Sequence, residues 1–141
     1  MKILIFCVLM AIQASGQGLD MDILAEIESG HDPKAVNRSA RVPSYGLYQV
    51  APICLRAYNQ AVGTKFTVDD LLDSATNRAI AVWYIEIEIP RILRRYRKPV
   101  TTRNLLISYN AGVRYVKTGD KIPAITSRYI DRYLKRLKNK R

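Results

Sequence analysis

The sequence of 141 residues contains very little histidine and cysteine: one histidine, His31, and two cysteines, Cys7 and Cys54. A structural zinc site takes about four Cys or His ligands, and a disulfide framework takes several pairs of cysteines. This inventory is too small for either, so the composition argues against transition-metal chemistry. We expect the protein to work without a metal ion or any other cofactor.

Long hydrophobic runs are also scarce, and the longest spans residues 3–12 at the N-terminus. It is preceded by Lys2 and followed by small residues at 14–16, an order typical of a secretory signal peptide. The run is much shorter than the roughly 20 apolar residues that a membrane-spanning helix needs. We predict that residues 1–16 are a cleaved export signal and that residues 17–141 form one domain. The expected location is the periplasm or cell envelope, or a virion or the medium if a phage encodes the chain.

Acidic residues are outnumbered, because 12 Asp and Glu face 23 Lys and Arg, for a formal net charge of +11. Such an excess binds nucleic-acid phosphates, attracts an anionic cell envelope or forms solvated helix faces. An exported protein rarely meets nucleic acid, and an aromatic nucleic-acid-binding motif is missing. We therefore expect the anionic envelope, and no nucleic acid, as a partner. Two basic segments carry much of the charge: Arg91, Arg94, Arg95, Arg97, Lys98 and Arg103, and then Arg128, Arg132, Lys135, Arg136, Lys138, Lys140 and Arg141.

Hydrophobic residues recur at helical spacing along most of the chain, which predicts a mostly α-helical single domain. Residues 85–89 alternate isoleucine and glutamate as a strand does, but the flanking sequence favours a helix. We expect Thr67 or Asp69 to cap a short helical turn, and Thr101 or Thr102 to begin a later helix. The expected helices cover residues 19–29, 53–62, 74–83 with a continuation that meets Pro90, a segment from 101 onward, and 124–137.

The segment 124–137 is expected to be an amphipathic helix. Its predicted apolar side consists of Ile125, Tyr129, Ile130, Tyr133, Leu134 and Leu137.

An irregular stretch, residues 31–52, separates the first two expected helices and is punctuated by Pro33, Pro43, Gly46 and Pro52. A structureless stretch of this length in a compact domain is usually functional. We expect a loop there, with room for a short β-hairpin.

Glu28 is the candidate catalytic residue. It lies at the predicted end of a helix, where the negative end of the dipole and the apolar neighbours Ile23 and Ile27 disfavour a charged carboxylate. Both effects raise the pKa of a carboxyl group. A carboxyl that stays protonated near neutral pH is what a general acid needs. Position alone does not separate Glu28 from an ordinary surface glutamate, so the following motifs matter.

Four short motifs follow one another along the chain: Glu28-Ser29, Gly46-Leu47-Tyr48-Gln49, Tyr109-Asn110-Ala111-Gly112 and Tyr129-Ile130. In this order they resemble the soluble lytic transglycosylase (SLT) domain family, which has a goose-lysozyme-like helical fold. The resemblance runs from about Ile23 to Leu137. The sequence departs from the family pattern at Tyr48, where methionine is usual, and around His31.

The resemblance implies a lytic transglycosylase that binds peptidoglycan glycan strands and cleaves between N-acetylmuramic acid and N-acetylglucosamine, leaving a 1,6-anhydro product. Glu28 would protonate the glycosidic oxygen, and its carboxylate would then accept a proton from the C6 hydroxyl of the sugar. One enzymatic carboxyl group suffices for this scheme, whereas most glycosidases use two. The substrate-binding residues carried over from the family are Ser29, Gln49, Tyr109, Asn110 and Tyr129.

Other functions remain open at this point. Asp32 as a base for water would make the protein a hydrolytic lysozyme, although its Gly-x-Asp-Pro context is typical of a turn. His31 with Cys54 is the one pair available for a cysteine peptidase. A basic protein that binds the envelope or nucleic acid without catalysis is a further alternative. The sequence does not choose between a secretion apparatus, wall turnover and a phage that enters or leaves its host.

Overall fold

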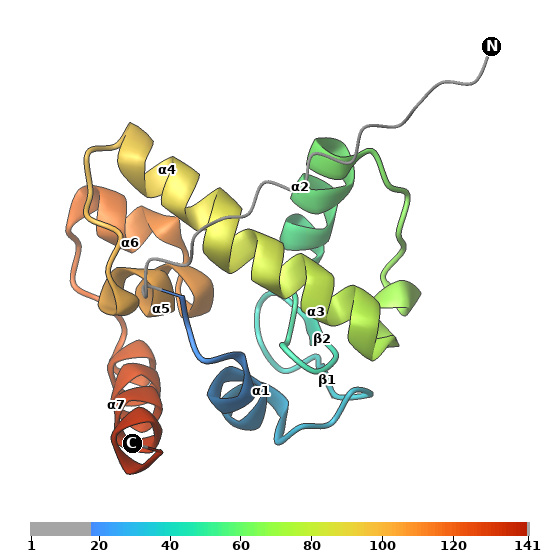
Figure 1. Cartoon of the computed structure of the whole chain (residues 1–141), viewed down its shortest axis with the longest axis horizontal. Coiled ribbons are helices and arrows are strands. Elements are labelled where there is room, and N and C mark those ends of the chain that lie inside the picture. The colour runs from blue at the N-terminus through green and yellow to red at the C-terminus, as the bar shows by residue number, and fades with distance from the viewer. Residues whose placement is uncertain (1–17, 141) are drawn as a thin grey trace.

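The structure is a computed structural model that describes residues 18–140. The predicted export signal, residues 1–16 with Cys7, lies outside these described residues. The described chain is mostly helical, as predicted, and has one two-stranded hairpin (Figure 1). Among residues 18–140, every helix is too short or too polar to cross a membrane.

The helices follow the predicted order, with one addition. Residues 113–118 form a helix that the sequence analysis did not anticipate. The elements are α1 (Met21–Ser29), β1 (Val36–Asn37), β2 (Ser44–Tyr45), α2 (Pro52–Val62), the 3-10 turn η1 (Asp69–Leu72), α3 (Ser74–Trp83), the π-helical turn η2 (Tyr84–Glu88), α4 (Ile89–Arg95), α5 (Thr102–Asn110), α6 (Val113–Thr118) and α7 (Ala124–Asn139).

A continuous rod made of α3, η2 and α4 crosses the molecule, and the other helices surround it (Figure 1). The alternating segment 85–89 belongs to this rod, so the preference for a helix is confirmed. Ile85 and Ile89 are fully buried, whereas Ile87 between them is 46% exposed. Burial of residues four apart is the helical pattern, and the alternation in the sequence only mimics a strand. The buried residues of the rod are Asn77, Ile80, Ala81, Ile85, Ile89, Pro90 and Leu93.

Pro90 does not end this rod, which continues to Arg95. The predicted continuation from Trp83 to Pro90 is therefore confirmed, and the helix extends beyond Pro90. The Ile89 N–H donates to the Tyr84 carbonyl five residues back, which marks the wider π-helical turn. Pro90 follows at the junction where the hydrogen-bond pattern changes back to the α-helical one. Its missing N–H thus interrupts the helix only where the pattern already changes.

Helix ends follow local rules at most positions. Gly30 and Gly63 end α1 and α2 in the left-handed conformation, as the sequence suggests. The Thr101 side chain accepts the Asn104 N–H and begins α5. The expected capping of η1 by Thr67 or Asp69 is wrong, because Thr67 instead donates to a carboxylate one turn ahead, that of Asp70.

The exposed side of α7 differs from the prediction at two positions. Tyr129, Ile130 and Tyr133 are buried as predicted, but Ile125 is 63% exposed and Leu134 is 44% exposed. These two side chains project from opposite flanks of the apolar side of α7, and the neighbouring helices cover only its centre. Thr126 is buried there as well.

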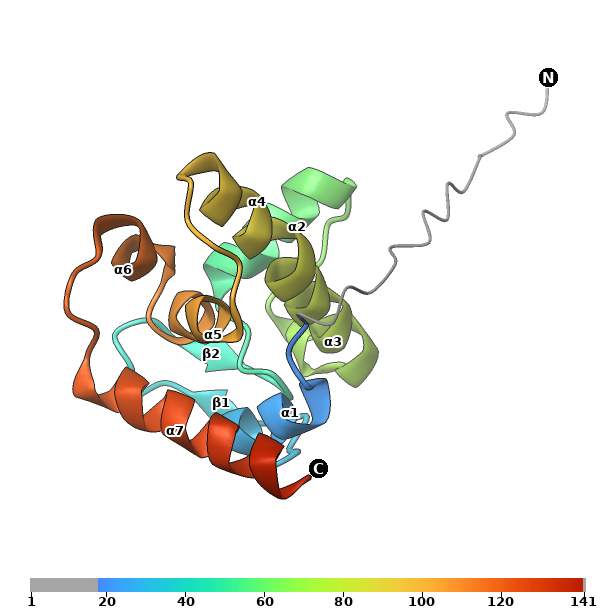
Figure 2. The same cartoon turned by 60° about the vertical axis from the view of Figure 1, so that its left-hand side comes forward.

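α7 packs side by side with α1 across one face of the molecule (Figure 2). The Tyr133 hydroxyl accepts the backbone N–H of Asp20, at 2.6 Å, where α1 begins. Asp20 also caps α1 by accepting the N–H groups of Asp22 and Ile23. The start of the first helix is thus fixed by a residue near the end of the last one.

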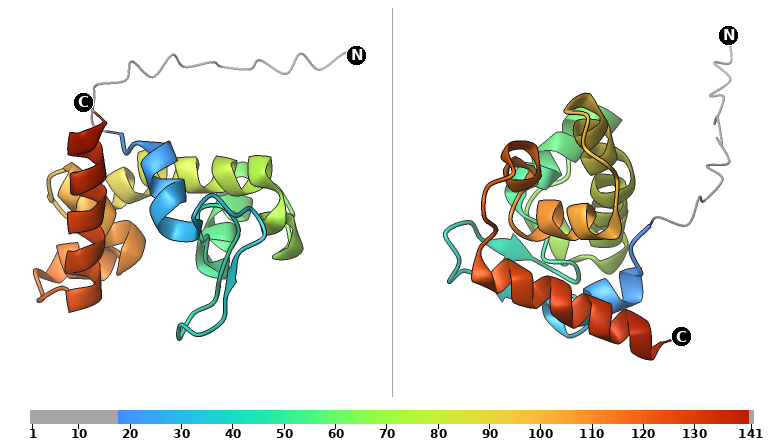
Figure 3. Two further views of the ribbon diagram at one scale, coloured as in Figure 1. Left: turned by 90° about the horizontal axis from the view of Figure 1, so that it is seen from below. Right: turned by 90° about the vertical axis from the view of Figure 1, so that its left-hand side faces the viewer.

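The loop between α1 and α2 contains the short hairpin. Val36 pairs with Tyr45 and Asn37 with Ser44 in an antiparallel register. The hairpin loop projects from the body of the molecule (Figure 3). After β2 the chain turns tightly, and a bridge between Tyr45 and Val50 closes this turn. A hairpin within residues 31–52 is therefore confirmed.

Gly46 provides a test of this packing. It has a φ of +74°, and an added Cβ would overlap the Leu71 carbonyl oxygen and the Asn77 side-chain amide. We expect Gly46→Ala to destabilise the protein by about 3 kcal/mol, from left-handed strain and overpacking together. Gly63 is a matched control, because its φ is +79° but an added Cβ would meet nothing within 4 Å. Gly63→Ala should cost only about 1 kcal/mol in urea unfolding; equal costs for both variants would contradict this account.

Candidate active site

Glu28 lies in the last turn of α1, next to Ser29 and the left-handed Gly30 that ends the helix. Its side chain is partly buried under α7. The Tyr129 hydroxyl, from α7, donates a hydrogen bond of 2.6 Å to Glu28 Oε1. The site therefore joins residues 101 positions apart in the sequence.

Burial raises the pKa of the Glu28 carboxyl from 4.5 to about 7. The hydrogen bond from Tyr129 and the positive charge of Arg132 act in the opposite direction and lower it. Burial and the neighbouring Glu28 also raise the pKa of the Tyr129 hydroxyl, which thus stays protonated as a donor. A carboxyl with a pKa near 7 can give up a proton and take one back at neutral pH.

The turn of residues 45–50 lies beside Glu28 and is held from three helices. Ser29 Oγ, on α1, donates to the Leu47 carbonyl at 2.7 Å. The Tyr109 hydroxyl, on α5, donates to the Tyr48 carbonyl at 2.6 Å. Asn77, on α3, accepts the Tyr48 N–H at 2.8 Å and donates to the Tyr45 carbonyl at 2.8 Å. These bonds fix the position of the turn relative to Glu28.

Asn77 is a site-forming residue that the sequence analysis did not single out. Its side chain is fully buried, and its amide also donates to the Leu71 carbonyl. Both the carbonyl oxygen and the NH₂ group of this side chain are thus hydrogen-bonded to backbone groups. The signal in the sequence was an asparagine near the start of a helix, three and four residues before Ile80 and Ala81 on its buried side, which alone does not reveal its partners.

Tyr48, where the family usually has methionine, is also accounted for by the structure. The residue is 3% exposed, and its hydroxyl accepts a hydrogen bond from Arg78 at 2.9 Å. The aromatic ring therefore occupies an apolar position while its polar tip reaches a partner near the surface.

The amides of Gln49 and Asn110 are both engaged within the protein. Gln49 Nε2 donates to the carbonyls of Gly46 and Ala35, and its Oε1 accepts from Ser44. Asn110, at the exposed end of α5, accepts from the Thr126 hydroxyl in α7 at 2.8 Å. Gln49 adopts a φ of +50°, which is uncommon for a residue with a side chain. Its amide bonds hold it in that conformation.

A cavity of about 40 Å³ lies between this turn and the central rod. It has room for a water molecule or a small group. Cys54 lies on its wall, and burial raises the pKa of the thiol to about 11. The thiol is therefore neutral at ordinary pH, which argues against a cysteine nucleophile, while His31 is exposed after the end of α1. The lining residues are Gln49, Val50, Ala51, Cys54, Ala81, Tyr84 and Tyr109.

Asp32, the candidate second carboxylate, is an exposed turn residue. Its Oδ1 accepts the backbone N–H of Lys34 at 2.8 Å. This is the Asx-turn geometry that its sequence context suggests. Within residues 18–140, His, Cys, Asp and Glu form no group of three or more that would hold a metal ion.

The structure thus brings Glu28, Ser29, Gln49, Tyr109 and Tyr129 to one region, with Asn110 at its edge. A mostly helical domain with one buried carboxylic acid at its site is the arrangement expected of a lysozyme-like domain. The chain belongs to the Transglycosylase SLT domain family, whose sequence model matches residues 19–130. Membership implies peptidoglycan cleavage of the lytic transglycosylase type. Searches of curated proteins and of solved structures gave no match.

The pKa of Glu28 has a consequence for stability. A carboxyl pKa raised from 4.5 to about 7 means that the stability present below pH 4.5 is lost as the pH rises to about 7. Glu28→Gln removes the buried charge and keeps the acceptor for Tyr129. We expect this variant to be more stable than the wild type by about 2 to 3 kcal/mol at pH 8, and nearly equal to it at pH 4.5. Urea unfolding at both pH values measures the difference, and a gain that is the same at both would refute the assignment.

Proposed function

We propose that this protein is a peptidoglycan lytic transglycosylase with Glu28 as its single catalytic acid and base. The bond cleaved is the β-1,4 linkage from N-acetylmuramic acid to N-acetylglucosamine. The observation that carries the proposal is a buried Glu28 with a pKa of about 7, bonded to Tyr129, in a chain of the SLT family.

In the first half-reaction, the Glu28 carboxyl gives its proton to the glycosidic oxygen as the bond to C1 of the muramic acid breaks. N-acetylglucosamine leaves with that proton as its new hydroxyl. In the second half-reaction, the C6 hydroxyl oxygen of the muramic acid attacks C1, and its proton returns to the Glu28 carboxylate. The 1,6-anhydro ring is closed without water, and the enzyme regains its starting protonation state.

Other residues of the site have proposed supporting roles. Tyr129 holds Glu28 in place through its 2.6 Å hydrogen bond and lies where it would approach the N-acetyl group of the sugar. Ser29, Gln49 and Tyr109 position the turn that would form one wall of the glycan site. Asn110 is exposed at the end of α5, where it would line the saccharide cleft.

A hydrolytic lysozyme is the nearest alternative, because it cleaves the same bond with water as the nucleophile. It would need a base for that water, and Asp32 is occupied as an exposed turn residue. The transglycosylase mechanism needs only the carboxyl that is buried. We therefore favour the transglycosylase.

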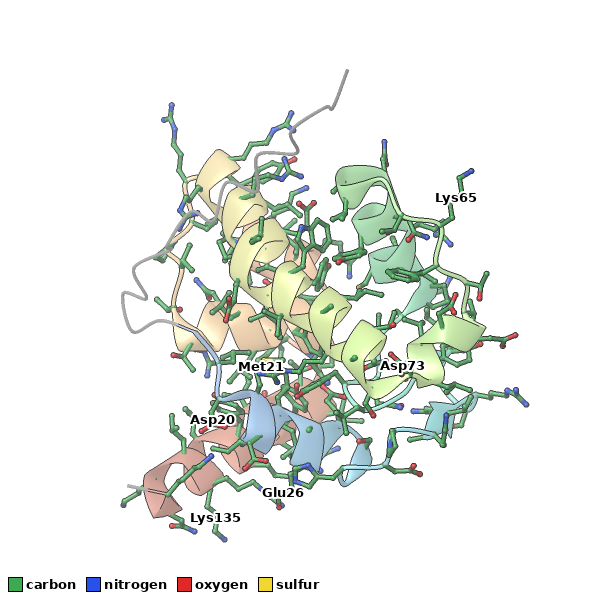
Figure 4. All side chains as sticks on the ribbon, turned by 45° about the vertical axis from the view of Figure 1, so that its right-hand side comes forward. Asp20, Met21, Glu26, Lys65, Asp73 and Lys135 are labelled. Atoms are coloured by element: carbon green, nitrogen blue, oxygen red, sulfur yellow. The ribbon has the colours of Figure 1, made fainter. Side chains whose placement is uncertain are left out.

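The basic segments support a second part of the proposal, that the protein is exported and held on an anionic envelope. Lys135 and its neighbours lie on the outer side of α7, and the segment 91–103 covers the end of α4 and the start of α5 (Figure 4). Peptidoglycan carries many carboxylates, so long-range attraction would raise the local concentration of the enzyme.

The first test is Glu28→Gln assayed on purified peptidoglycan. We expect release of soluble fragments to fall by at least about 100-fold, because the amide cannot protonate the leaving oxygen. Glu26→Gln is a matched control on the same helix, since the Glu26 side chain is 46% exposed and paired with Arg136. Mass spectrometry of the wild-type products should show anhydro ends, which lack one water. Unchanged activity of Glu28→Gln would refute the proposal, and reducing-end products would assign a lysozyme.

The second test concerns binding. The inactive Glu28→Gln variant should bind peptidoglycan several-fold more weakly at about 1 M salt than at about 0.1 M, because the screening length falls from roughly 10 Å to roughly 3 Å. Co-sedimentation with insoluble peptidoglycan measures this. Binding that does not respond to ionic strength would count against electrostatic attachment.

A further inference from the structure

Opposite charges line the contact between α1 and α7. Lys140 Nζ lies 2.9 Å from Asp20 Oδ2 and 3.4 Å from Asp22 Oδ2. One turn earlier on α7, Arg136 Nε lies 2.7 Å from Glu26 Oε1. Figure 4 shows Asp20 and Glu26 along α1, beside α7. We call this arrangement the α1–α7 ladder, with Lys140 and Arg136 as its first two cations.

A third cation continues the ladder. Arg132 lies four residues before Arg136, so the two share one side of α7. Arg132 also follows Tyr129 by three residues, so it lies one turn along α7 from the hydroxyl that binds Glu28. The first two pairs are complete at hydrogen-bond distance, whereas Glu28 is bonded to Tyr129 instead. Within residues 18–140, the side chain of Arg132 makes no ion pair or hydrogen bond.

Glu28 differs in its burial from the carboxylates that are paired in the ladder. Glu26 is 46% exposed, and Asp20 and Asp22 lie at the solvent side of the ladder. Glu28 is more buried and has a pKa of about 7, so at neutral pH a large share of it is a neutral acid. A neutral acid offers Arg132 no ion pair. Once the acid has transferred its proton, a carboxylate remains beside a cation.

We propose that Arg132 is a positioning residue that completes the α1–α7 ladder by pairing with the Glu28 carboxylate between the two half-reactions. This inference rests on the proposed function. The pair would stabilise the carboxylate while the C6 hydroxyl approaches, and it would release Glu28 when the proton returns. Arg132 is exposed, so in this proposal its guanidinium would approach the carboxyl from the solvent side.

The groups that face Glu28 come from two packed helices. From α7 they are Tyr129 and Arg132, and from α5 the Tyr109 hydroxyl, whose pKa is raised by burial and then by the Glu28 charge. Both tyrosines stay protonated through the neutral range. Arg132 is therefore the one permanent charge among these neighbours. Its removal should change the titration of Glu28 more than the loss of any other cation.

The first experiment compares pH profiles of kcat/KM on soluble glycan fragments. Arg132→Gln should move the alkaline limb upward by about 0.5 pH unit, because the carboxylate loses its partner. Arg132→Lys should restore most of the shift. Lys65→Gln removes the same charge at a site far from α7 and should leave the limb in place (Figure 4). A raised KM with an unmoved limb in Arg132→Gln would make Arg132 a substrate contact and overturn the proposal.

The second experiment does not depend on activity. The wild type, Glu28→Gln, Arg132→Gln and the double variant form a mutant cycle, measured by urea unfolding. At pH 8 the cycle should show a coupling of about threefold in the folded-to-unfolded ratio, which corresponds to 0.5 pH unit. At pH 5 the carboxyl is neutral and the coupling should vanish. An equal coupling at both pH values, or none at pH 8, would overturn the proposal.

The two proposals fail in different ways. If Glu28→Gln still releases anhydro fragments, the proposed function is wrong, whatever the cycle shows. If Glu28→Gln is inactive but the cycle shows no coupling at pH 8, Glu28 remains the catalytic acid and only the role of Arg132 is wrong.

Discussion

The burial of one carboxyl group under a packed helix is the constraint on which the site depends. Glu28 is held at the end of α1 by Tyr129, and the neighbouring contact between Asp20 and Tyr133 fixes the other end of the same helix pair. The packing of α7 on α1 therefore supports the fold and sets the acidity of Glu28 together. A change that loosens α7 admits water to the carboxyl and lowers its pKa before it unfolds the domain.

Two opposing effects hold the pKa of Glu28 near neutrality. Burial raises it, while Tyr129 and Arg132 lower it. In the proposed mechanism, either effect alone would suit Glu28 to only one half-reaction, because a very weak acid does not give up its proton and a strong one does not take it back. Above pH 7 the buried carboxylate lowers the stability of the folded state below what a neutral side chain would give. Such a trade between stability and activity is common at catalytic sites.

Local features of the chain were readable from the sequence, whereas long-range partners were not. Gly30, Gly63 and Thr101 mark helix ends by rules that involve only neighbouring residues. The helix was also correctly preferred for residues 85–89, but its passage through Pro90 depends on a π-helical turn that spacing alone does not indicate. Ile125 fits the apolar pattern of α7 yet is exposed, because periodicity does not tell how wide a face the neighbours cover.

The same contrast between local features and long-range partners holds for the site. The raised pKa of Glu28 was expected from its position at a helix end beside apolar residues, but its contact with Tyr129 is a matter of tertiary packing and came only from the family resemblance. Asn77 was missed because the role of its buried amide depends on the backbone carbonyl and N–H groups that it binds. Those groups come close to Asn77 only in the folded chain.

The turn of residues 45–50 explains why so many polar side chains serve structure next to the acid. Gly46 and Gln49 both have positive φ, and such conformations persist only where the surroundings determine them fully. Ser29, Asn77 and Tyr109, on three different helices, restrain the turn by hydrogen bonds to its backbone. Because these bonds already exist in the free protein, a glycan would meet a wall that needs little rearrangement, and its binding energy is available to orient the glycosidic oxygen toward Glu28. In the proposed mechanism, a single carboxyl group could then serve both half-reactions, since the geometry around it is fixed before the substrate arrives.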